Sequence, residues 1–440
     1  ARPERLDTMR AAALLERGAA RAQQELADRP LVQAKLLTSI GQAYVGMGRY
    51  TDADTLLRTS VQLLRRDSTD RAQLADALNA LGVLGLSTNR PGDAEPLFRE
   101  VVDIRKATLP PGDAAIAGGL SNLAASLQDQ DRFDDAVRVY HEALAMVRAA
   151  PKPDSARLAA LLNGRANLAM RVNQLDSAAT YLRQVVEVER QRVGEKHPAF
   201  LNNLGNLAVL LRTTGKAQEA EPIQREVTTL TRAQLGPDHP RTVSAMIGLA
   251  QNIALLNRRA EAATLFEEAL GAARRVYGPR SPDLARATSQ YGDLLAAAGD
   301  TAAAAAQART AWEINVAALG PSHHDAGLTR TKLAILRCAL GYHDEAIAHY
   351  RAALTILEAG SPPNDPWPVQ TRAALGSCFT RIARYSEAEA HLVAAWERSR
   401  ANPALNRLVP AIARRLVALY EAWGKPERAQ PYRSAAQATG

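Results

Sequence analysis

The clearest candidates for chemistry in this sequence are histidines that stand after a polar residue and before a proline. GPDHP at 236–240 places His239 beside an acid, an arrangement that suits a metal ligand or a general base. GEKHP at 194–198 lies 42 residues earlier, GPRSP at 278–282 lies 42 residues later, and GPSHH at 320–324 follows after another 42. Histidines one full repeat apart belong to different helix pairs. We therefore expect no shared metal ion and interpret the motif as punctuation between helices.

Each residue of this motif also has a role at a helix boundary. Gly236 can take the left-handed conformation that ends a helix, and Asp238 or His239 can cap the next helix. Pro240 fits the first turn of that helix, because the position needs no amide donor. We therefore predict loops, and not catalytic centres, at these places.

Other candidates for a reactive or metal-binding site are incomplete. His323 and His324 adjoin Asp325, and we interpret them as residues that cap a helix. HEALA at 141–145 lacks the second histidine of a zinc-binding helix, and the sequence has no CxxC pair, phosphate-binding loop or nucleophile elbow. The sequence therefore predicts no catalytic residue, no metal ligand and no cofactor.

The cysteines and tryptophans are interpreted from their spacing. Cys338 and Cys378 lie in adjacent repeats at places that are not equivalent, so we do not expect a disulfide framework. Trp312 and Trp396 are 84 residues apart, two whole repeats, and are expected to pack in the core. Trp367 lies in the proline-rich stretch SPPNDPWP and is either an exposed contact or, as we favour, buried under that loop.

An apolar framework with the same period extends along nearly the whole chain. A small residue recurs at steps of 41 or 42. Its ten copies are Ala53, Ala94, Ala136, Ala178, Ala220, Ala262, Ala304, Ala346, Ala388 and Ala429. Twelve residues before each copy stands another small or aliphatic residue, such as Gly41, and four residues after it the side chain is usually large, as in Leu57. Self-similarity at such a period indicates a repeat architecture.

Each repeat is predicted to form two helices. In residues 120–148, LSNLAASLQDQDRFDDAVRVYHEALAMVR, apolar residues recur at spacings of three and four, with a break at DQDRF. The small residues let the two helices of a pair approach closely, and the large ones are expected to fill the gap to the next pair. We predict an all-α fold, with residues 1–29 as an N-terminal capping or docking helix and residues 30–440 as one ten-unit solenoid.

The order of these small, Tyr, Ala and aromatic positions resembles the tetratricopeptide repeat, whose usual period is about 34 residues. The longer period, the LG..HP loops and NLA at 122–124 and 206–208 resemble the kinesin-light-chain subtype. The roughly eight extra residues amount to about two helical turns, so each helix is expected to be about one turn longer. The resemblance implies a right-handed α-solenoid of about ten helix-turn-helix repeats plus an N-terminal helix.

Some residues depart from the pattern. Arg337 occupies the usual Tyr position of the eighth unit, and Gln224 and Arg433 occupy the large apolar position of theirs, so we expect altered local packing there. The N-terminal part, from Leu14 onward, also resembles the repeat region that follows the kinase domain in some bacterial serine/threonine kinases. No kinase motif is present in the sequence.

Composition excludes several classes of partner. The net charge is +8, but the basic residues are dispersed along the chain, which also has 46 acidic residues. A nucleic-acid surface would cluster its basic residues on one face, so this distribution does not fit one. No apolar run reaches the length of a membrane span. The chain begins at Ala1, so a signal peptide or a kinase domain is a possible upstream neighbour. The compartment stays open between the cytoplasm and, after removal of a signal peptide, the cell exterior.

The family resemblance implies that peptides bind on the concave face lined by the first helices. Polar side chains predicted by register to project there share donors and acceptors suited to a peptide backbone. They are Asn79, Asn122, Gln128, Asn163, Asn167, Arg171, Asn202, Asn206, Arg212 and Gln251. Of these, Arg171 and Arg212 are expected to be able to take a carboxylate.

Three functions follow from these expectations. The first is a non-catalytic scaffold that binds a peptide or protein segment. The second is a structural protein that assembles head to tail into a filament or tube, since the N-terminal helix is amphipathic (Leu6, Met9, Ala13, Leu14) and the last helix is short and interrupted by Pro431. The alanine-rich stretch 301–310 is a candidate lateral contact. The third is the regulatory repeat segment of a bacterial serine/threonine kinase.

Overall fold

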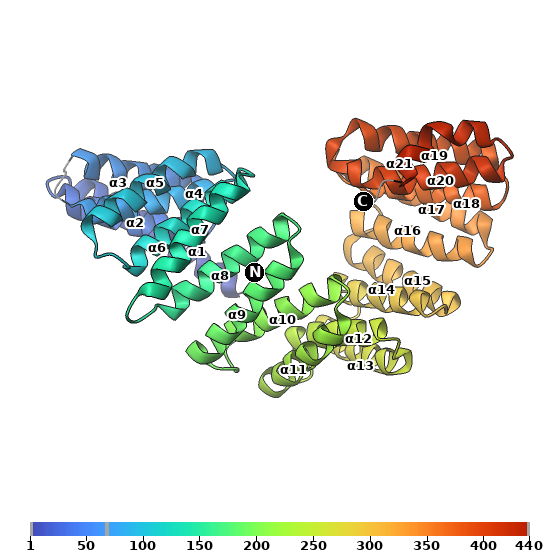
Figure 1. The fold of residues 1–440 in the computed structure, drawn as a ribbon, viewed down its shortest axis with the longest axis horizontal. Coiled ribbons are helices and arrows are strands. Elements are labelled where there is room, and N and C mark those ends of the chain that lie inside the picture. Colours follow the sequence, from blue (N-terminus) through green and yellow to red (C-terminus); the bar gives the residue numbers. More distant parts are fainter. Residues whose placement is uncertain (1–2, 67–69, 438–440) are drawn as a thin grey trace. The chain divides into compact units, whose positions relative to one another are not determined.

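The computed structural model describes residues 3–66 and 70–437, with side chains described from residue 12 onward. Over these residues the chain forms 21 α-helices and two short 3-10 helices, and no strand (Figure 1). The all-α prediction is confirmed. Among the described helices, none is both long enough and apolar enough to cross a bilayer.

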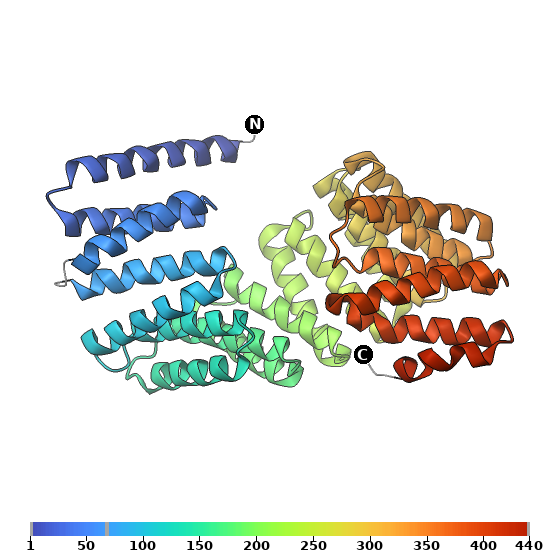
Figure 2. The same cartoon turned by 90° about the horizontal axis from the view of Figure 1, so that it is seen from above.

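The chain divides into two compact units, of which unit 1 is Ala1–Gly215. Its helices follow one another in chain order as successive pairs (Figure 2). They are α1 (Pro3–Glu25), α2 (Pro30–Gly46), α3 (Tyr50–Arg66), α4 (Arg71–Ser87), α5 (Pro91–Thr108), α6 (Ala114–Asp129), α7 (Phe133–Ala149), α8 (Ser155–Arg171), α9 (Leu175–Val193) and α10 (Pro198–Thr213). The even-numbered helices from α2 onward are the first helices of the pairs, and the odd-numbered ones from α3 onward are the second helices.

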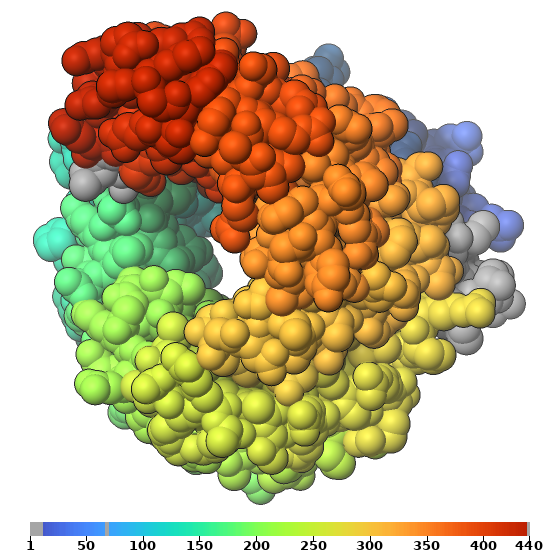
Figure 3. Space-filling view, turned by 90° about the vertical axis from the view of Figure 1, so that its right-hand side faces the viewer, coloured from blue at the N-terminus to red at the C-terminus, as the bar shows by residue number. Residues whose placement is uncertain are grey.

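Unit 2 is Lys216–Gly440 and continues the same alternation. In Figure 3 its segments succeed one another over the visible surface, from green through orange to red. Its helices are α11 (Ala217–Leu235), α12 (Pro240–Leu255), α13 (Arg259–Tyr277), α14 (Pro282–Ala297), α15 (Thr301–Leu319), α16 (His324–Ala339), α17 (His343–Gly360), α18 (Trp367–Arg381), α19 (Tyr385–Ala401), η1 (Pro403–Leu408), α20 (Val409–Ala422), η2 (Pro426–Ala429) and α21 (Gln430–Gln437).

The repeating alanines form the buried spine of the fold. All ten, from Ala53 to Ala429, have an exposed fraction of 0%. A methyl group is the largest side chain that leaves the two helices of a pair in close contact at these places. The predicted period is therefore confirmed along both units.

Some of the large side chains pack inside their own pair, whereas others reach the following pair as expected, for example Phe266, whose ring stacks on that of Tyr291 with centroids 5.4 Å apart. A Cβ on Gly41 would lie 2.7 Å from Leu57, and one on Gly82 would lie 2.6 Å from the ring of Phe98. Tyr140 is different, because its ring lies against Gly164 of the following pair. The small residue of the first helix thus makes room for the large residue of the second.

The polar departure at Gln224 is accommodated by a hydrogen bond. Its side chain is 5% exposed, and its Nε2 donates to the carbonyl of Ala245 at 3.1 Å. A buried amide costs little when it is paired, so the repeat keeps its packing despite the polar residue. Arg337 is half-buried against the ring of Tyr342 and forms an ion pair with Glu345 at 3.3 Å.

The histidine motif is confirmed as helix punctuation. The Nδ1 atom of His239 accepts a hydrogen bond from the amide of Arg241 at 3.1 Å, and that of His197 accepts from Ala199 at the same distance. Asp238 does not cap the helix, because its carboxylate pairs with Arg275 at 2.7 Å. Gly236 has φ 84° and ψ 168°, so it takes an extended conformation reserved for glycine and not the left-handed helical one.

Exposed ion pairs connect successive second helices. A cation on one helix pairs with Glu 36 residues later on the next. Examples are Lys106–Glu142 at 2.7 Å, Arg232–Glu268 at 2.7 Å and Arg309–Glu345 at 3.0 Å. Because these pairs are solvated, each contributes at most about 1 kcal/mol to stability.

The two ends of the chain differ from the expectation in part. Leu6 and Met9 lie outside the residues whose side chains are described. The helix α21 is short, with 8 residues, but Pro431 stands in its first turn after η2 and does not interrupt it. The ring of Tyr432 packs on those of Trp396 and Tyr420, with centroids 5.2 and 6.0 Å away.

Candidate functional site

The first helices of each unit follow one another along the stack. Several neighbouring first helices pack on one another, for example α2 on α4 and α16 on α18. Most of the large apolar side chains that remain exposed belong to these helices. They are Val32, Leu36, Met170, Val209, Leu255, Ile335 and Trp367. We call the exposed side of the first helices the first-helix face.

Two of the predicted groove residues bind each other. The Nδ2 atom of Asn122 on α6 donates to Oδ1 of Asn79 on α4 at 2.8 Å. Both side chains are half-buried. The bond joins neighbouring repeats and leaves one N–H and two acceptor positions of Asn122, and two N–H groups and one acceptor position of Asn79, for a ligand.

The predicted carboxylate acceptor Arg171 already has carboxylate partners within the chain. Its guanidinium donates to Asp129 and to Asp131 of the preceding repeat, each at 2.9 Å. It also lies over the ring of Phe133, with 5.4 Å between the guanidinium carbon and the ring centroid. A ligand carboxylate would have to compete with two aspartates at this place.

Arg212 is the better candidate for an incoming carboxylate. It is half-buried near the end of α10, and burial lowers the pKa of its guanidinium. No described acid counters that effect. A cation that has lost part of its hydration gains most from a new anionic partner.

The other predicted residues lie at varied depths. Asn167, Asn202 and Asn206 are exposed, while Asn163 and Gln251 are half-buried. Gln128 is half-buried too, and its Oε1 atom is covered without a hydrogen-bond partner. None of the ten predicted residues lines a described pocket.

The structure places a pocket of about 440 Å³ on the first-helix face of unit 2. It is formed by α14, α16 and the start of α18, and α15 contributes one side chain from behind. We call it the Trp367 pocket. Its lining residues are Pro282, Asp283, Arg286, Ser289, Gln290, Asp293, Asn315, Asp325, Leu328, Thr329, Lys332 and Trp367.

Trp367 is held in this pocket by a hydrogen-bonded acid. Asp365, 8% exposed, accepts from the amide of Trp367 at 3.0 Å and lies 2.9 Å from Nε2 of His324. Burial alone would raise the pKa of Asp365, but the bonds from the Trp367 amide and His324 lower it, so the carboxylate stays charged. The indole is 36% exposed. The expectation of burial under the loop was wrong, because Trp367 is the first residue of α18 and remains exposed there.

Most charges in the Trp367 pocket are paired within the chain. Lys332 donates to Asp293 at 2.7 Å and to Ser289 at 2.9 Å. Asp283 pairs with Arg286 at 2.6 Å.

Two acceptors of the pocket keep no such partner. The carboxylate of Asp325 has only His323 and His324 nearby, at 4.0 and 3.8 Å. Asn315 is 4% exposed, and its Oδ1 atom has no hydrogen-bond partner. An aromatic face beside unpaired acceptors is suited to a cationic group.

A second pocket, of about 700 Å³, lies on the second helices α11 and α13 over α12. It is larger, but its charges are already neutralised. Arg225 and Arg232 pair with Glu261 and Glu268 at 3.3 and 2.7 Å. The other residues that line it are threonine or aliphatic. This pocket therefore offers fewer unpaired charged groups to a ligand than the Trp367 pocket does.

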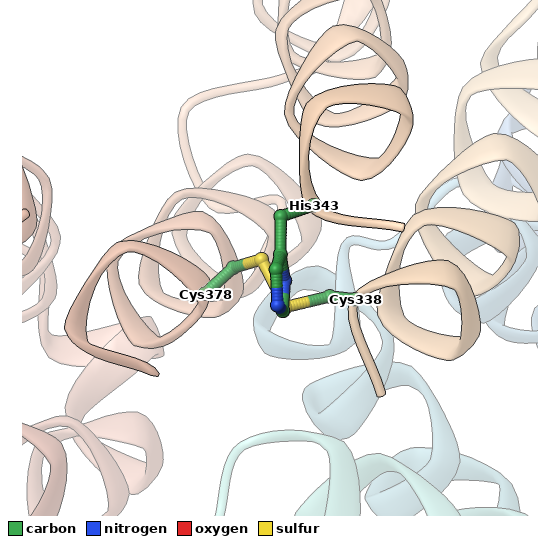
Figure 4. A group of neighbouring side chains, drawn as sticks. All are labelled: Cys338, His343 and Cys378. Atoms are coloured by element: carbon green, nitrogen blue, oxygen red, sulfur yellow. A yellow bond between two sulfur atoms is a disulfide. The ribbon is translucent and has the colours of Figure 1, made fainter. Parts of the chain in front are cut away.

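The two cysteines are bonded, contrary to the expectation that they form no disulfide. Cys338 on α16 and Cys378 on α18 form a disulfide across adjacent repeats, and the ring of His343 lies beside it, with Nδ1 at 3.8 Å from Sγ of Cys338 (Figure 4). The prediction failed because it compared register positions within a repeat. Two first helices packed side by side can bring unlike positions together. Similarly, His323 caps α16 as expected, whereas His324 binds Asp365 instead.

Sequence reasoning missed most of the Trp367 pocket, although a signal existed. Lys332 has the register of Asn122 and Asn206, two residues before the small residue of the first helix. Ser289 has the register of Asn79, three residues before it. Extending the asparagine positions through unit 2 would have marked both. Asn315 had no such signal, because it reaches the pocket from a second helix.

Comparison with known proteins identifies the family of this repeat. The family model of the tetratricopeptide repeat matches residues 32–107, 115–191, 199–275, 253–315 and 325–401. Comparison with curated proteins finds no significant match.

Solved structures resemble this chain at low sequence identity. The apo form of RapI is 12% identical over 82% of this chain and 96% of that chain, with a TM-score of 0.54. BtubC (BKLC) from P. vanneervenii is 22% identical over 55% of this chain and 91% of that chain, with a TM-score of 0.41. The apo form of the quorum sensor NprR from B. thuringiensis is 12% identical over 83% and 99%, with a TM-score of 0.48. At 12% identity the likeness to RapI concerns the fold alone.

Proposed function

The chain belongs to the tetratricopeptide-repeat family, and from this premise we propose that it is a non-catalytic scaffold that binds a peptide or protein segment on its first-helix face. The observation that carries the proposal is the Trp367 pocket, where an exposed indole stands beside unpaired acceptors. The predicted polar residues of the first helices are further candidate contacts along that face.

The pocket favours a partner segment with a positively charged side chain. Arg and Lys side chains stack on indole faces and donate to carboxylates, and the pocket volume of about 440 Å³ accommodates either. Asp325 supplies the charge. Asn and Gln side chains elsewhere on the face suit the backbone of the same segment.

Selection of a random peptide library on the immobilised full chain tests this function. Selected peptides are expected to be enriched in Arg or Lys and to bind Trp367→Ala at least about tenfold more weakly, as for loss of a central aromatic anchor. Leu235→Ala is the matched control, because Leu235 is 39% exposed in the same unit but lies outside the pocket. Far-UV circular dichroism verifies that both variants are folded. Failure to select any peptide, or equal binding by Trp367→Ala, would overturn the proposal.

A second candidate function, head-to-tail self-assembly, is favoured by one feature of unit 1. Leu14, Val32 and Leu36 at its N-terminal end are 69%, 53% and 40% exposed. Apolar side chains exposed on the outer helices of a repeat stack offer a surface on which another copy can pack. Electron microscopy of the chain over a range of concentrations tests this, with Val32→Asp/Leu36→Asp as the variant that should abolish polymers. Isolated particles of the wild-type chain at high concentration would reject it.

A further inference from the structure

Three side chains able to bind a metal converge where the eighth and ninth repeats meet. Cys338 belongs to the last turn of α16, His343 begins α17, and Cys378 belongs to α18 (Figure 4). Their ligand atoms all lie within 4.8 Å of one another. The sulfurs are joined in a disulfide, and Nδ1 of His343 lies 3.8 Å from Sγ of Cys338.

The position of the imidazole is not explained by the disulfide. Two helices can be crosslinked by two cysteines alone, yet His343 is directed at the sulfurs. Gly341, with φ 89°, turns the chain between α16 and α17, and the amide of His343 donates to its carbonyl at 2.9 Å. Among the residues that the structure describes, the ring of His343 has no other hydrogen bond than its contact with Cys338.

We propose that, when the disulfide is reduced, Cys338, His343 and Cys378 bind one thiophilic divalent ion of the Zn²⁺ type. Two thiolates and a neutral imidazole are typical zinc ligands, and three protein ligands leave a fourth position for water. Zn–S bonds of about 2.3 Å require the sulfurs to stand roughly 3.8 Å apart in a tetrahedral site. The Cα atoms of the cysteines are 6.1 Å apart, so rotation of the side chains provides that separation.

The burial of the three residues suits such a site. Cys338 and Cys378 are 5% and 2% exposed, which protects metal–thiolate bonds from water. His343 is only half-buried and leaves one side of the site near solvent, where the ion can arrive. The ion would connect α16 to α18 as the disulfide does, so the contact between the two repeats is kept in both states.

Atoms and electrons balance in the conversion between the disulfide and the metal-bound form. A dithiol reductant delivers two electrons and two protons to the S–S bond, which breaks into two thiols while the dithiol becomes a disulfide. Binding of the divalent ion then displaces the two thiol protons to solvent, and the imidazole donates a lone pair from its unprotonated nitrogen. No other oxidant or reductant is needed.

Cobalt titration of the full chain tests the proposal. The chain is reduced with dithiothreitol, desalted without oxygen and titrated with Co²⁺, whose thiolate bonds give a charge-transfer absorption in the near ultraviolet. We expect saturation at one equivalent, loss of the band on addition of Zn²⁺, and no band for the oxidised chain. Cys338→Ser/Cys378→Ser should show no band, and His343→Gln should bind at least tenfold more weakly. His141→Gln, an exposed histidine on α7, is the matched control and should bind as the wild type.

Two results would overturn the proposal. One is a reduced wild-type chain that absorbs no more than the double cysteine variant at equal Co²⁺. The other is a His343→Gln chain that titrates like the wild type, which would remove the histidine from the site. Circular dichroism accompanies every titration. If the double cysteine variant loses helix content, the oxidised wild-type chain replaces it as the reference without available thiols.

Discussion

Asn122 donates a hydrogen bond of 2.8 Å to Asn79, 43 residues earlier in the chain. Lys332 and Ser289 are joined in the same way at 2.9 Å, across the same 43-residue step and at the equivalent positions of unit 2. The first-helix face therefore carries a recurrent polar contact between neighbouring repeats. In unit 2 the contact lies in the Trp367 pocket, where Lys332 is held by Ser289 and Asp293.

A double-mutant cycle on Asn79→Ala and Asn122→Ala measures this contact. Half-buried side-chain hydrogen bonds contribute about 1 kcal/mol net, and each single variant also leaves the other amide unpaired. We expect the two variants to be non-additive by about 1 kcal/mol in urea unfolding of the full chain. Additive losses would show that the two amides do not interact in solution.

The close contact between Gly82 and Phe98 gives a second prediction. Gly82→Ala places a methyl group 2.6 Å from a fully buried ring, and overpacking of this kind costs about 1–3 kcal/mol. The better helix propensity of alanine recovers only about 1 kcal/mol, so we expect a lower melting temperature.

The control for this substitution lies in the same unit. Gly205 is inside α10, and a Cβ there meets nothing within 4 Å. Gly205→Ala should therefore leave the melting temperature unchanged or raise it. Equal effects of the two substitutions would contradict the packing of Phe98 over Gly82.

The lowered pKa of His349 leads us to expect a loss of stability on mild acidification. Burial and then Arg330 lower its pKa in the folded chain, against the opposing effect of Glu345. Above pH ~6.5, the usual histidine value, the ring is neutral in both states and the shift has no effect. As the pH falls below that value, the unfolded chain gains a proton that the folded chain resists, so stability decreases.

A neutral side chain at this place should remove part of the pH dependence. We expect the melting temperature of His349→Gln to fall less than that of the wild type between pH 7 and 5. The exposed His141→Gln provides the comparison. Burial also lowers the pKa of His391. Some dependence of the melting temperature on pH should therefore remain in His349→Gln. If the melting temperatures of His349→Gln and the wild type fell in parallel with pH, the pKa of His349 would not be lowered in the folded chain.

Much of the fold follows from the sequence because the repeat constrains it locally. Ala53 and its nine equivalents are buried as their period predicts, and His197, His239 and His323 cap helices as their loops predict. These features depend on contacts within one helix pair or one turn. Positions a few residues apart decide them, so a single sequence suffices.

The features that sequence reasoning missed depend on contacts between repeats. Cys338 meets Cys378 because α16 packs on α18, although their positions within the repeat differ. The Trp367 pocket needs α14, α15, α16 and the turn at Asp365 together. Such contacts follow from the stagger of neighbouring first helices. A one-dimensional period fixes only the residues that recur, and not that stagger.

The affinity of one selected peptide for two chains tests the central claim most directly. The peptide and its twin, in which the Arg or Lys is replaced by Gln, are titrated by calorimetry against the wild type and Asp325→Asn. The wild type should prefer the charged peptide by about tenfold or more, and Asp325→Asn should lose most of that preference. If Asp325→Asn keeps the full preference for the charged peptide, the Trp367 pocket does not recognise a cationic side chain, and the account of the site is wrong.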